Sequence, residues 1–163
     1  MILYVLRHAT AEEAGDDGAR KLTARSSEKM RDAADGMRAL GLKFEVILTS
    51  PLVRAAETAE IVAAAYANTP APQVLPALAT GVAAAEVVTA LKPFARYSDV
   101  MIVGHEPQLS ELGSMLLSGS AEVVHIRLKQ GSCIALELPA RFDRGGAELR
   151  WMMTARQLRR SRK

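Results

Sequence analysis

Residues 1–10 read MILYVLRHAT. Ile2–Leu6 is a short run of apolar and aromatic side chains, which is typical of a buried strand. The run stops at Arg7 and His8, two neighbouring side chains that can carry positive charge. A buried strand that ends on such a pair predicts that a ligand-binding edge of a sheet begins there.

Strand-like and helix-like segments alternate after this first strand. A strand followed by a helix and another strand builds a parallel sheet with helices on both faces. Thr23 is a plausible N-cap for the first helix, and Gly41 is a plausible residue to end it. The predicted strands are 44–49, a short one at 73–75, and 99–104; the predicted helices are 23–40, 52–66, 83–92 and 108–117.

The pattern changes after residue 120. The segments 122–128, 132–139 and 147–153 read as three strands, with turns at 129–131 and 143–146. We expect this meander to extend the same sheet in the antiparallel sense. The predicted fold class is therefore α/β, a three-layer α/β/α sandwich with a mostly parallel central sheet and an antiparallel C-terminal edge.

The bulk composition fits one globular domain. The chain has 163 residues, of which 49% are hydrophobic and 24% charged. No apolar run is long enough to span a membrane, and the N-terminus lacks the features of a signal peptide, so we expect a cytoplasmic protein with no membrane partner. The one cysteine, Cys133, lies in an apolar run and is expected to be a small buried side chain.

The basic character of the chain is local. The last eight residues, RQLRRSRK, carry five positive charges, and removing these five from the formal net charge of +3 leaves the rest at −2. We therefore expect a single domain over 1–155 and a basic, disordered tail over 156–163, or alternatively a tail that docks an acidic partner. Aromatic residues are only 4%, no nucleic-acid motif is present, and no nucleic-acid partner is expected.

Three predicted strands end in polar signatures. The first ends LRHAT, with Arg7 and His8; the second runs into LTSPLVRAAET, with Arg54; the third ends VGHEP, with His105. Ligands bind beyond the carboxyl ends of the strands in open α/β sheets. If the three strands are parallel, both histidines and both arginines converge on one edge.

Two permanent positive charges in a cleft call for an anion, and arginine matches phosphate oxygens in a bidentate manner. A neutral imidazole can attack phosphorus, and a second, protonated histidine can stabilise charge on the phosphoryl oxygens. The alternative is a metal ion held by His8, His105 and Glu106, but two flanking arginines would repel it and the ligand set is thin. No metal is therefore expected. No serine–histidine–aspartate set presents itself, and His125, in an alternating run, is expected to have no catalytic role.

The motifs LRHA, LTSPLVRAAETAEI and VGHEP resemble the signatures of the histidine phosphatase superfamily, which includes the cofactor-dependent phosphoglycerate mutases. The resemblance implies a phosphoglycerate mutase-like fold and a covalent phosphohistidine intermediate, without a cofactor. It makes His8 the nucleophile, Arg7 and Arg54 the phosphate clamps, and His105 the second, electrophilic histidine. Ser50 matches the serine of the second motif and is expected to form a structural turn.

Within the superfamily the chain resembles the short bacterial phosphohistidine phosphatases. Only residues 9–22 separate the first strand from its helix, so little chain is left for a lid, and an open site suits a phosphorylated residue on another protein. The segment DDGARKLT resembles the DxxRxLT stretch of these enzymes. Asp17, Arg20 and Glu106 are accordingly expected to bind substrate.

The sequence departs from the family at two places. Ala9 replaces a common glycine, which narrows the space beside the phosphate by one methyl group. The segment LPALATG has Ala77 where many members carry an acidic residue, and no carboxylate follows until Glu86. A missing proton donor favours phosphohistidine over an alcohol phosphate, because the imidazole ring can already be protonated when it leaves. Asp17 and Glu106 are the remaining candidate acids.

These observations predict a metal-independent phosphatase that removes phosphate from phosphohistidine on a partner protein. A phosphotransfer domain or a phosphocarrier protein fits an open site, which suggests a role in signal transduction. The alternatives are a broad small-molecule phosphomonoesterase and a non-catalytic module that binds phosphoproteins.

Overall fold

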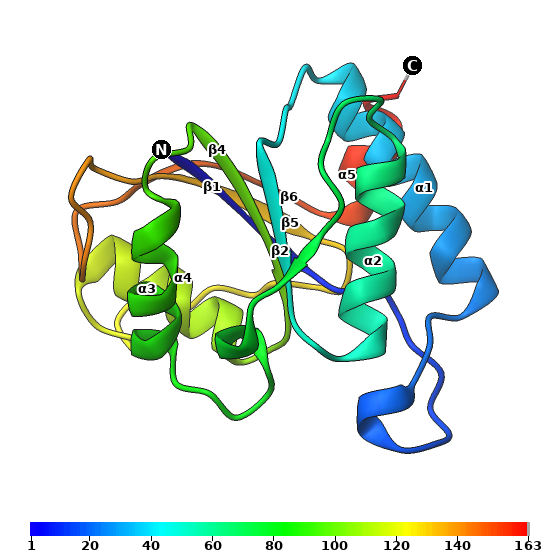
Figure 1. Cartoon of the computed structure of the whole chain (residues 1–163), viewed down its shortest axis with the longest axis horizontal. Helices are drawn as coiled ribbons and strands as arrows, with labels where there is room; N and C mark the ends of the chain where they lie inside the picture. The colour runs from blue at the N-terminus through cyan, green and yellow to red at the C-terminus, as the bar shows by residue number, and fades with distance from the viewer. Residues whose placement is uncertain (163) are drawn as a thin grey trace.

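A six-stranded sheet lies between two layers of helices in the computed structural model, which describes residues 1–162 (Figure 1). The strands are β1 (Ile2–Arg7), β2 (Val46–Thr49), β3 (Gln73–Val74), β4 (Asp99–Gly104), β5 (Cys133–Glu137) and β6 (Glu148–Met153). The α-helices are α1 (Ala24–Ala39), α2 (Val53–Ala64), α3 (Ala84–Leu91), α4 (Gln108–Ser118) and α5 (Ala155–Arg160). Three short 3-10 helices are η1 (Asp17–Ala19), η2 (Pro76–Leu78) and η3 (Lys92–Phe94).

The sheet has the order β3-β2-β4-β1-β5-β6. Strands β1 to β4 run parallel, and β5 and β6 form an antiparallel edge. Strand β4 lies between β1 and β2, with Gly104 opposite Arg7 and Val103 opposite Thr49. The carboxyl ends of β1, β2 and β4 therefore meet at one edge, and the predicted fold class is confirmed.

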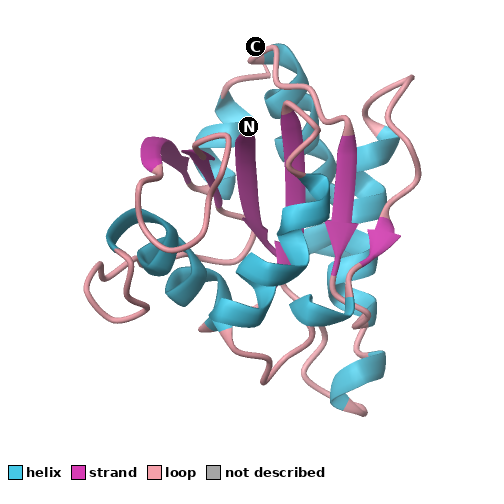
Figure 2. Ribbon diagram, turned by 60° about the vertical axis from the view of Figure 1, so that its left-hand side comes forward, coloured by secondary structure: helices cyan, strands magenta, loops and turns pink. Residues whose placement is uncertain are grey.

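Alternation along the strands builds two hydrophobic cores. In β1, Leu3 and Val5 face the layer of α3 and α4, whereas Tyr4 and Leu6 face the layer of α1, α2 and α5. Figure 2 shows the strands between helices on both sides. Cys133 is fully buried in the second core, where burial raises the pKa of its thiol. Within residues 1–162, no helix combines the length and apolarity needed to cross a membrane.

The predicted boundaries of the first helix follow from its caps. The Thr23 hydroxyl accepts a hydrogen bond from the backbone N–H of Ser26 at 3.1 Å, as an N-cap residue does. Gly41 follows the last turn with φ of +75°, a left-handed conformation that glycine adopts at little cost. Both predictions for α1 are confirmed.

The predicted strand over 122–128 is wrong. The alternation is real, because Val124, Ile126 and Leu128 turn inward while His125 and Arg127 are exposed. The inward side chains pack beside α4, however, and the segment makes no ladder with the sheet, whose β1 edge is already paired with β5. The C-terminal meander therefore has two strands.

The predicted disordered tail is also wrong for the part of it that the structure describes. Residues 155–160 form α5, and Thr154 and Gln157 cap its start reciprocally. Leu158 is fully buried against the α1 layer, and Arg162 pairs with Asp32 of α1. The prediction of a disordered tail rested on the basic residues, which include Arg156, Arg159, Arg160 and Arg162, whereas the buried Leu158 holds a helix there. Lys163 lies outside the described residues.

Candidate functional site

A polar cavity of about 190 Å³ lies at the carboxyl edge of β1 and β4. Six of the seven predicted site residues line it. Its full lining is Arg7, His8, Ala11, Arg20, Arg54, Thr80, His105, Glu106 and Gln130. The seventh predicted residue, Asp17, contacts two of the lining arginines. A larger hollow of about 570 Å³ between α1 and α2 contains none of these residues.

The end of β1 fixes the first two site residues. The backbone N–H of His8 donates to the carbonyl of Gly104 at 3.1 Å, and that of Arg7 donates to Ser132 at 3.1 Å. The Arg7 guanidinium donates to the carbonyl of Leu128 at 2.8 Å. Hydrogen bonds to β4 and to the segment before β5 therefore fix the backbone at the end of β1, and the same segment orients the Arg7 side chain.

The two ring nitrogens of His8 differ in their contacts. Its Nδ1 lies 2.6 Å from the carbonyl oxygen of Ala9, which can only accept, so Nδ1 carries the proton and Nε2 carries the lone pair. Burial lowers the pKa of His8 to about 4, and the positive charges of Arg54, Arg7 and Arg20 add to this. The imidazole is therefore neutral at neutral pH, with a lone pair suited to nucleophilic attack.

His105 faces His8, with ring centroids 5.0 Å apart and ring planes inclined by 54°. Its Nε2 lies 2.7 Å from the Ser50 hydroxyl, so Ser50 is more than the expected structural turn. Burial lowers the pKa of His105 to about 3, and His8 and Arg54 reinforce the shift. These surroundings favour a neutral ring, in contrast to the protonated second histidine that was expected, and within the described residues Nδ1 has no hydrogen-bond partner.

Arg54 lies in the first turn of α2 and is almost completely buried. Its Nη1 donates to the backbone carbonyl of Asp17 at 2.5 Å, and its Nη2 lies 3.4 Å from the Asp17 carboxylate. The hydroxyl of Thr58 donates to the Arg54 carbonyl at 2.7 Å and accepts from the backbone N–H of Ala9 at 3.1 Å. Thr58 thus ties the α2 clamp to the strand that carries His8.

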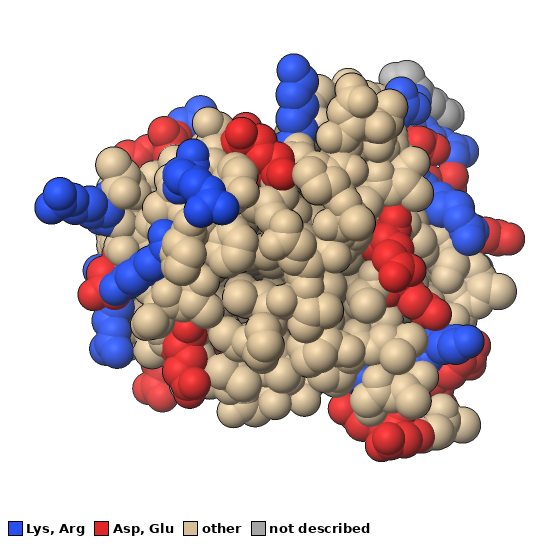
Figure 3. Space-filling model, in the orientation of Figure 1, with Lys and Arg blue, Asp and Glu red and all other residues tan. Residues whose placement is uncertain are grey.

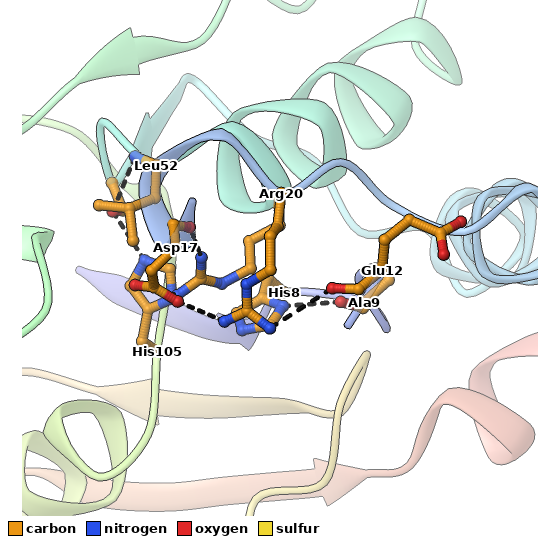
Figure 4. A network of polar contacts seen from close by, with 9 residues as sticks. His8, Ala9, Glu12, Asp17, Arg20, Leu52 and His105 are labelled. Atoms are coloured by element: carbon orange, nitrogen blue, oxygen red, sulfur yellow. Dashed lines mark hydrogen bonds and ion pairs between the residues drawn. The ribbon is translucent and has the colours of Figure 1, made fainter. Parts of the chain in front are cut away.

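The turn η1 brings Asp17 and Arg20 beside the two histidines (Figure 4). Asp17 pairs with Arg20 and with Arg54. The hydrogen bond from Arg20 is the main reason that the pKa of Asp17 lies below its usual value, and Arg54 contributes as well. Asp17 is therefore a carboxylate at neutral pH. The same lobe carries the exposed Glu12 and Glu13, and Figure 3 shows acidic side chains gathered there, at the lower right.

The pKa of Glu106 is shifted in the opposite direction to that of Asp17. It is half-buried between β4 and α4, and its carboxyl accepts from the backbone N–H of Ser110 at 3.1 Å and bonds the Ser110 hydroxyl. Burial raises the pKa of Glu106, against the opposing effects of Ser110 and Arg7. The pKa values of the two carboxyls left as candidate acids are therefore shifted in opposite directions.

Two polar residues of the cavity were not predicted from the sequence. Gln130 lies in the predicted turn before β5, where its Oε1 accepts from the Thr10 hydroxyl at 3.0 Å. Thr80 follows η2 and is the residue that the LPALATG segment contributes to the cavity. Neither belongs to a motif, although Thr80 lies in the same segment as Ala77. Glu86 lines a separate hollow with Ala77.

In the described part of the chain, no three His, Cys, Asp or Glu side chains come together in a group that could hold a metal ion. The charges that converge on the cavity come instead from Arg7, Arg20 and Arg54.

The chain is similar to known proteins over most of its length. The profile of the histidine phosphatase superfamily (branch 1) matches residues 3–79. An uncharacterized protein of a Picosynechococcus strain is 38% identical over 141 residues, which is 83% of this chain and 84% of that protein.

Two solved structures illustrate the shared fold. The protein histidine phosphatase SixA, solved with tungstate, has a TM-score of 0.85 at 23% identity, over 97% of this chain and 99% of that one. A putative alpha-ribazole-5'-P phosphatase from Escherichia coli has a TM-score of 0.78 at 21% identity, over 95% and 97% of the two chains. At these identities the likeness is one of fold.

Proposed function

The chain belongs to the histidine phosphatase superfamily, and on that premise we propose that it removes phosphate from phosphohistidine on a partner protein. The observation that carries the proposal is the state of His8. This side chain is neutral, its Nδ1 is tied to the Ala9 carbonyl, and its Nε2 is left as a nucleophile in a cavity lined by Arg7, Arg20 and Arg54.

In the proposed reaction, Nε2 of His8 attacks phosphorus while the bond from phosphorus to the substrate nitrogen breaks. The electron pair of that bond remains on the departing ring. Arg7 and Arg54 neutralise the phosphoryl oxygens, and the N–H of His105 donates to one of them. Water then attacks the phosphorus on His8, inorganic phosphate leaves, and Nε2 recovers its lone pair.

The size of the cavity supports a substrate borne by a protein. About 190 Å³ admits a phosphoryl group but not the body of a large substrate, which would remain outside. A phosphohistidine side chain on a phosphotransfer domain or a phosphocarrier protein meets this condition, and we place the protein in phosphotransfer signalling. The acidic lobe with Glu12 and Glu13 borders the approach.

The covalent step is tested with His8→Ala and, as a matched control, His125→Ala. His125 is exposed and lies outside the cavity lining. Incubated with a 32P-phosphohistidine protein, the wild type and the control should acquire an acid-labile label and release phosphate. The His8 variant should do neither, and undiminished turnover by it would exclude the proposal.

The substrate class is tested separately by comparing a phosphohistidine protein, phosphoserine peptides and a panel of small phosphates. We expect turnover of the phosphohistidine protein to exceed the others by at least tenfold. A small phosphate turned over fastest would indicate a phosphomonoesterase, and tight phosphate binding without hydrolysis would indicate a binding module.

Metal independence is part of the same proposal, because Arg7, Arg20 and Arg54 already supply positive charge at the cavity and repel a cation. Prolonged treatment with a chelator should leave turnover unchanged. Loss of activity that returns on adding a divalent metal would contradict this.

A further inference from the structure

Glu106 stands out among the residues around the cavity. Of the nine lining residues, it is the one that carries a carboxyl group. It follows His105 directly in the chain, at the carboxyl end of β4. The other acidic residue near the histidines, Asp17, is engaged by two arginines. In the described part of the chain, Glu106 has no ion pair with a basic residue.

The surroundings of Glu106 raise the pKa of its carboxyl above the usual value. Burial is the main influence, and Glu111 of α4 adds a like charge. Arg7 of β1 and the two hydrogen bonds from Ser110 act in the other direction without cancelling the effect of burial. Asp17 differs because its arginine contacts stabilise the charged form.

We propose that Glu106 is the catalytic acid that protonates the leaving group. The inference rests on the phosphatase function proposed above and adds the residue that the LPALATG segment fails to supply. Glu106 follows His105 in the chain and lines the same cavity as His8 and Arg7, so its carboxyl belongs to the site where the phosphoryl group would be transferred.

The proton balance has two halves. As Nε2 of His8 bonds to phosphorus and the substrate bond breaks, the Glu106 carboxyl gives its proton to the departing nitrogen or oxygen and becomes a carboxylate. In the second half, the carboxylate takes a proton from the attacking water, whose oxygen bonds to phosphorus as the bond to Nε2 breaks. Phosphate leaves and Glu106 is again protonated.

A purely structural role for Glu106 is the alternative that the test must separate. Its contacts with Ser110 satisfy an N–H in the first turn of α4, as a helix cap does. Glu106→Gln keeps an oxygen that can accept from this N–H but removes the acidic proton. Ser110→Ala removes the hydroxyl contact and keeps the carboxyl. Glu111→Gln removes a neighbouring charge outside the cavity lining.

The experiment compares these variants on aryl phosphates whose phenols differ in acidity, and on a phosphohistidine protein. A poor leaving group needs a proton and a good one does not. For Glu106→Gln we expect about a 100-fold loss of kcat/KM with the least acidic phenol and less than threefold with the most acidic. Glu111→Gln and Ser110→Ala should follow the wild-type dependence on the leaving group.

The pH profile supplies a second readout. Wild-type turnover of the poor leaving group should fall as the pH rises and Glu106 loses its proton, and this alkaline limb should be absent in Glu106→Gln. Equal losses across all leaving groups, or no loss with the poorest, would overturn the proposal. A thermal melt of each variant shows whether a uniform loss reflects unfolding.

The outcomes distinguish this inference from the proposed function. If the leaving-group dependence appears but the phosphohistidine protein is a poor substrate, Glu106 remains the acid and the substrate proposal fails. If phosphohistidine is turned over and Glu106→Gln follows the wild type on every substrate, the substrate proposal stands and Glu106 is not the acid. A wild type without turnover on any of them excludes both.

Discussion

The surroundings of His8 hold its ring in one neutral form. The Ala9 carbonyl accepts from Nδ1, and burial, with the charges of the surrounding arginines, opposes protonation of the ring. In the proposed reaction, such a ring needs no deprotonation before it attacks the phosphoryl group.

This state can be observed directly by long-range 1H–15N NMR of the imidazole nitrogens. At about pH 6 the folded protein should show His8 as neutral with the proton on Nδ1, because burial and the arginines lower its pKa to about 4. The urea-unfolded chain should titrate near 6.5. A His8 that titrates near 6.5 in the folded protein would contradict the assigned tautomer and its cause.

Thr58 makes a second prediction at this scale. Thr58→Val keeps the shape of the side chain but leaves the buried N–H of Ala9 without its acceptor. We expect the free energy of unfolding to fall by about 1–3 kcal/mol and turnover to fall about tenfold, since the positions of His8 and Arg54 both depend on this hydroxyl. Urea unfolding and steady-state kinetics measure both effects.

Thr58→Ser is the matched control, because it retains the hydroxyl that bonds Ala9 and Arg54. Thr58→Ser should retain most of the activity that Thr58→Val loses. A serine variant as impaired as the valine variant would show that the methyl group, and not the hydrogen bonds, matters at this position.

Residues that follow buried strands were predictable from the sequence pattern, and Asp17 and Arg20 from a motif, whereas the loop residues Gln130 and Thr80 were not. His8, Arg54 and His105 follow buried strands, so the topology of a parallel sheet brings them together. Gln130 and Thr80 reach the cavity from turns whose path depends on tertiary contacts. The opposite pKa shifts of Asp17 and Glu106 likewise depend on which side chains surround them, which spacing along the chain does not reveal.

At the scale of elements, the two wrong predictions have one cause. Residues 122–128 alternate as a strand does, and residues 156–162 are charged as a solvated tail is, so each has the local composition of another structure. In both segments, tertiary contacts override the local pattern. Residues 122–128 pack beside α4 and do not pair with the sheet, and the C-terminal segment packs against the α1 layer through Leu158.

The docking of α5 can be tested with Gly36→Ala. A Cβ at this position of α1 would lie 1.8 Å from the backbone oxygen of Leu158, so the two helices would have to separate. We expect a lower melting temperature even though alanine is the better helix former by about 1 kcal/mol.

Gly18→Ala is the matched control, because a Cβ there meets no atom within 4 Å and its φ is not in the left-handed region. Its melting temperature should remain close to that of the wild type. A Gly36 variant that melts as the wild type does would show that α5 is not held against α1 in solution.

For the whole molecule, the buried histidines predict a dependence of stability on pH. The pKa values of His8 and His105 in the folded protein, about 4 and about 3, lie below the unfolded value of about 6.5. The unfolded chain therefore takes up protons first, so the free energy of unfolding is highest above pH 6.5 and falls as the pH decreases toward 4.

Between about pH 7.5 and 5.5 this loss should be roughly 1 kcal/mol for each of the two histidines. Urea titrations at the two pH values measure it. Replacing His8 or His105 by Asn should reduce the dependence by about half, whereas His125→Asn, at an exposed position, should not. A wild type equally stable at both pH values would contradict the assigned pKa shifts.

Because β4 lies between β1 and β2, the parallel part of the sheet cannot be completed before β4 has been synthesised. Strands β1 and β2 are not neighbours, because β4 separates and pairs with both. While a ribosome is still synthesising the first 98 residues, the nascent chain carries His8 and Arg54 without the strand that joins them. The edge that holds the cavity therefore stays incomplete until residues 99–104 have been synthesised and paired, and a chain that ends before them lacks it.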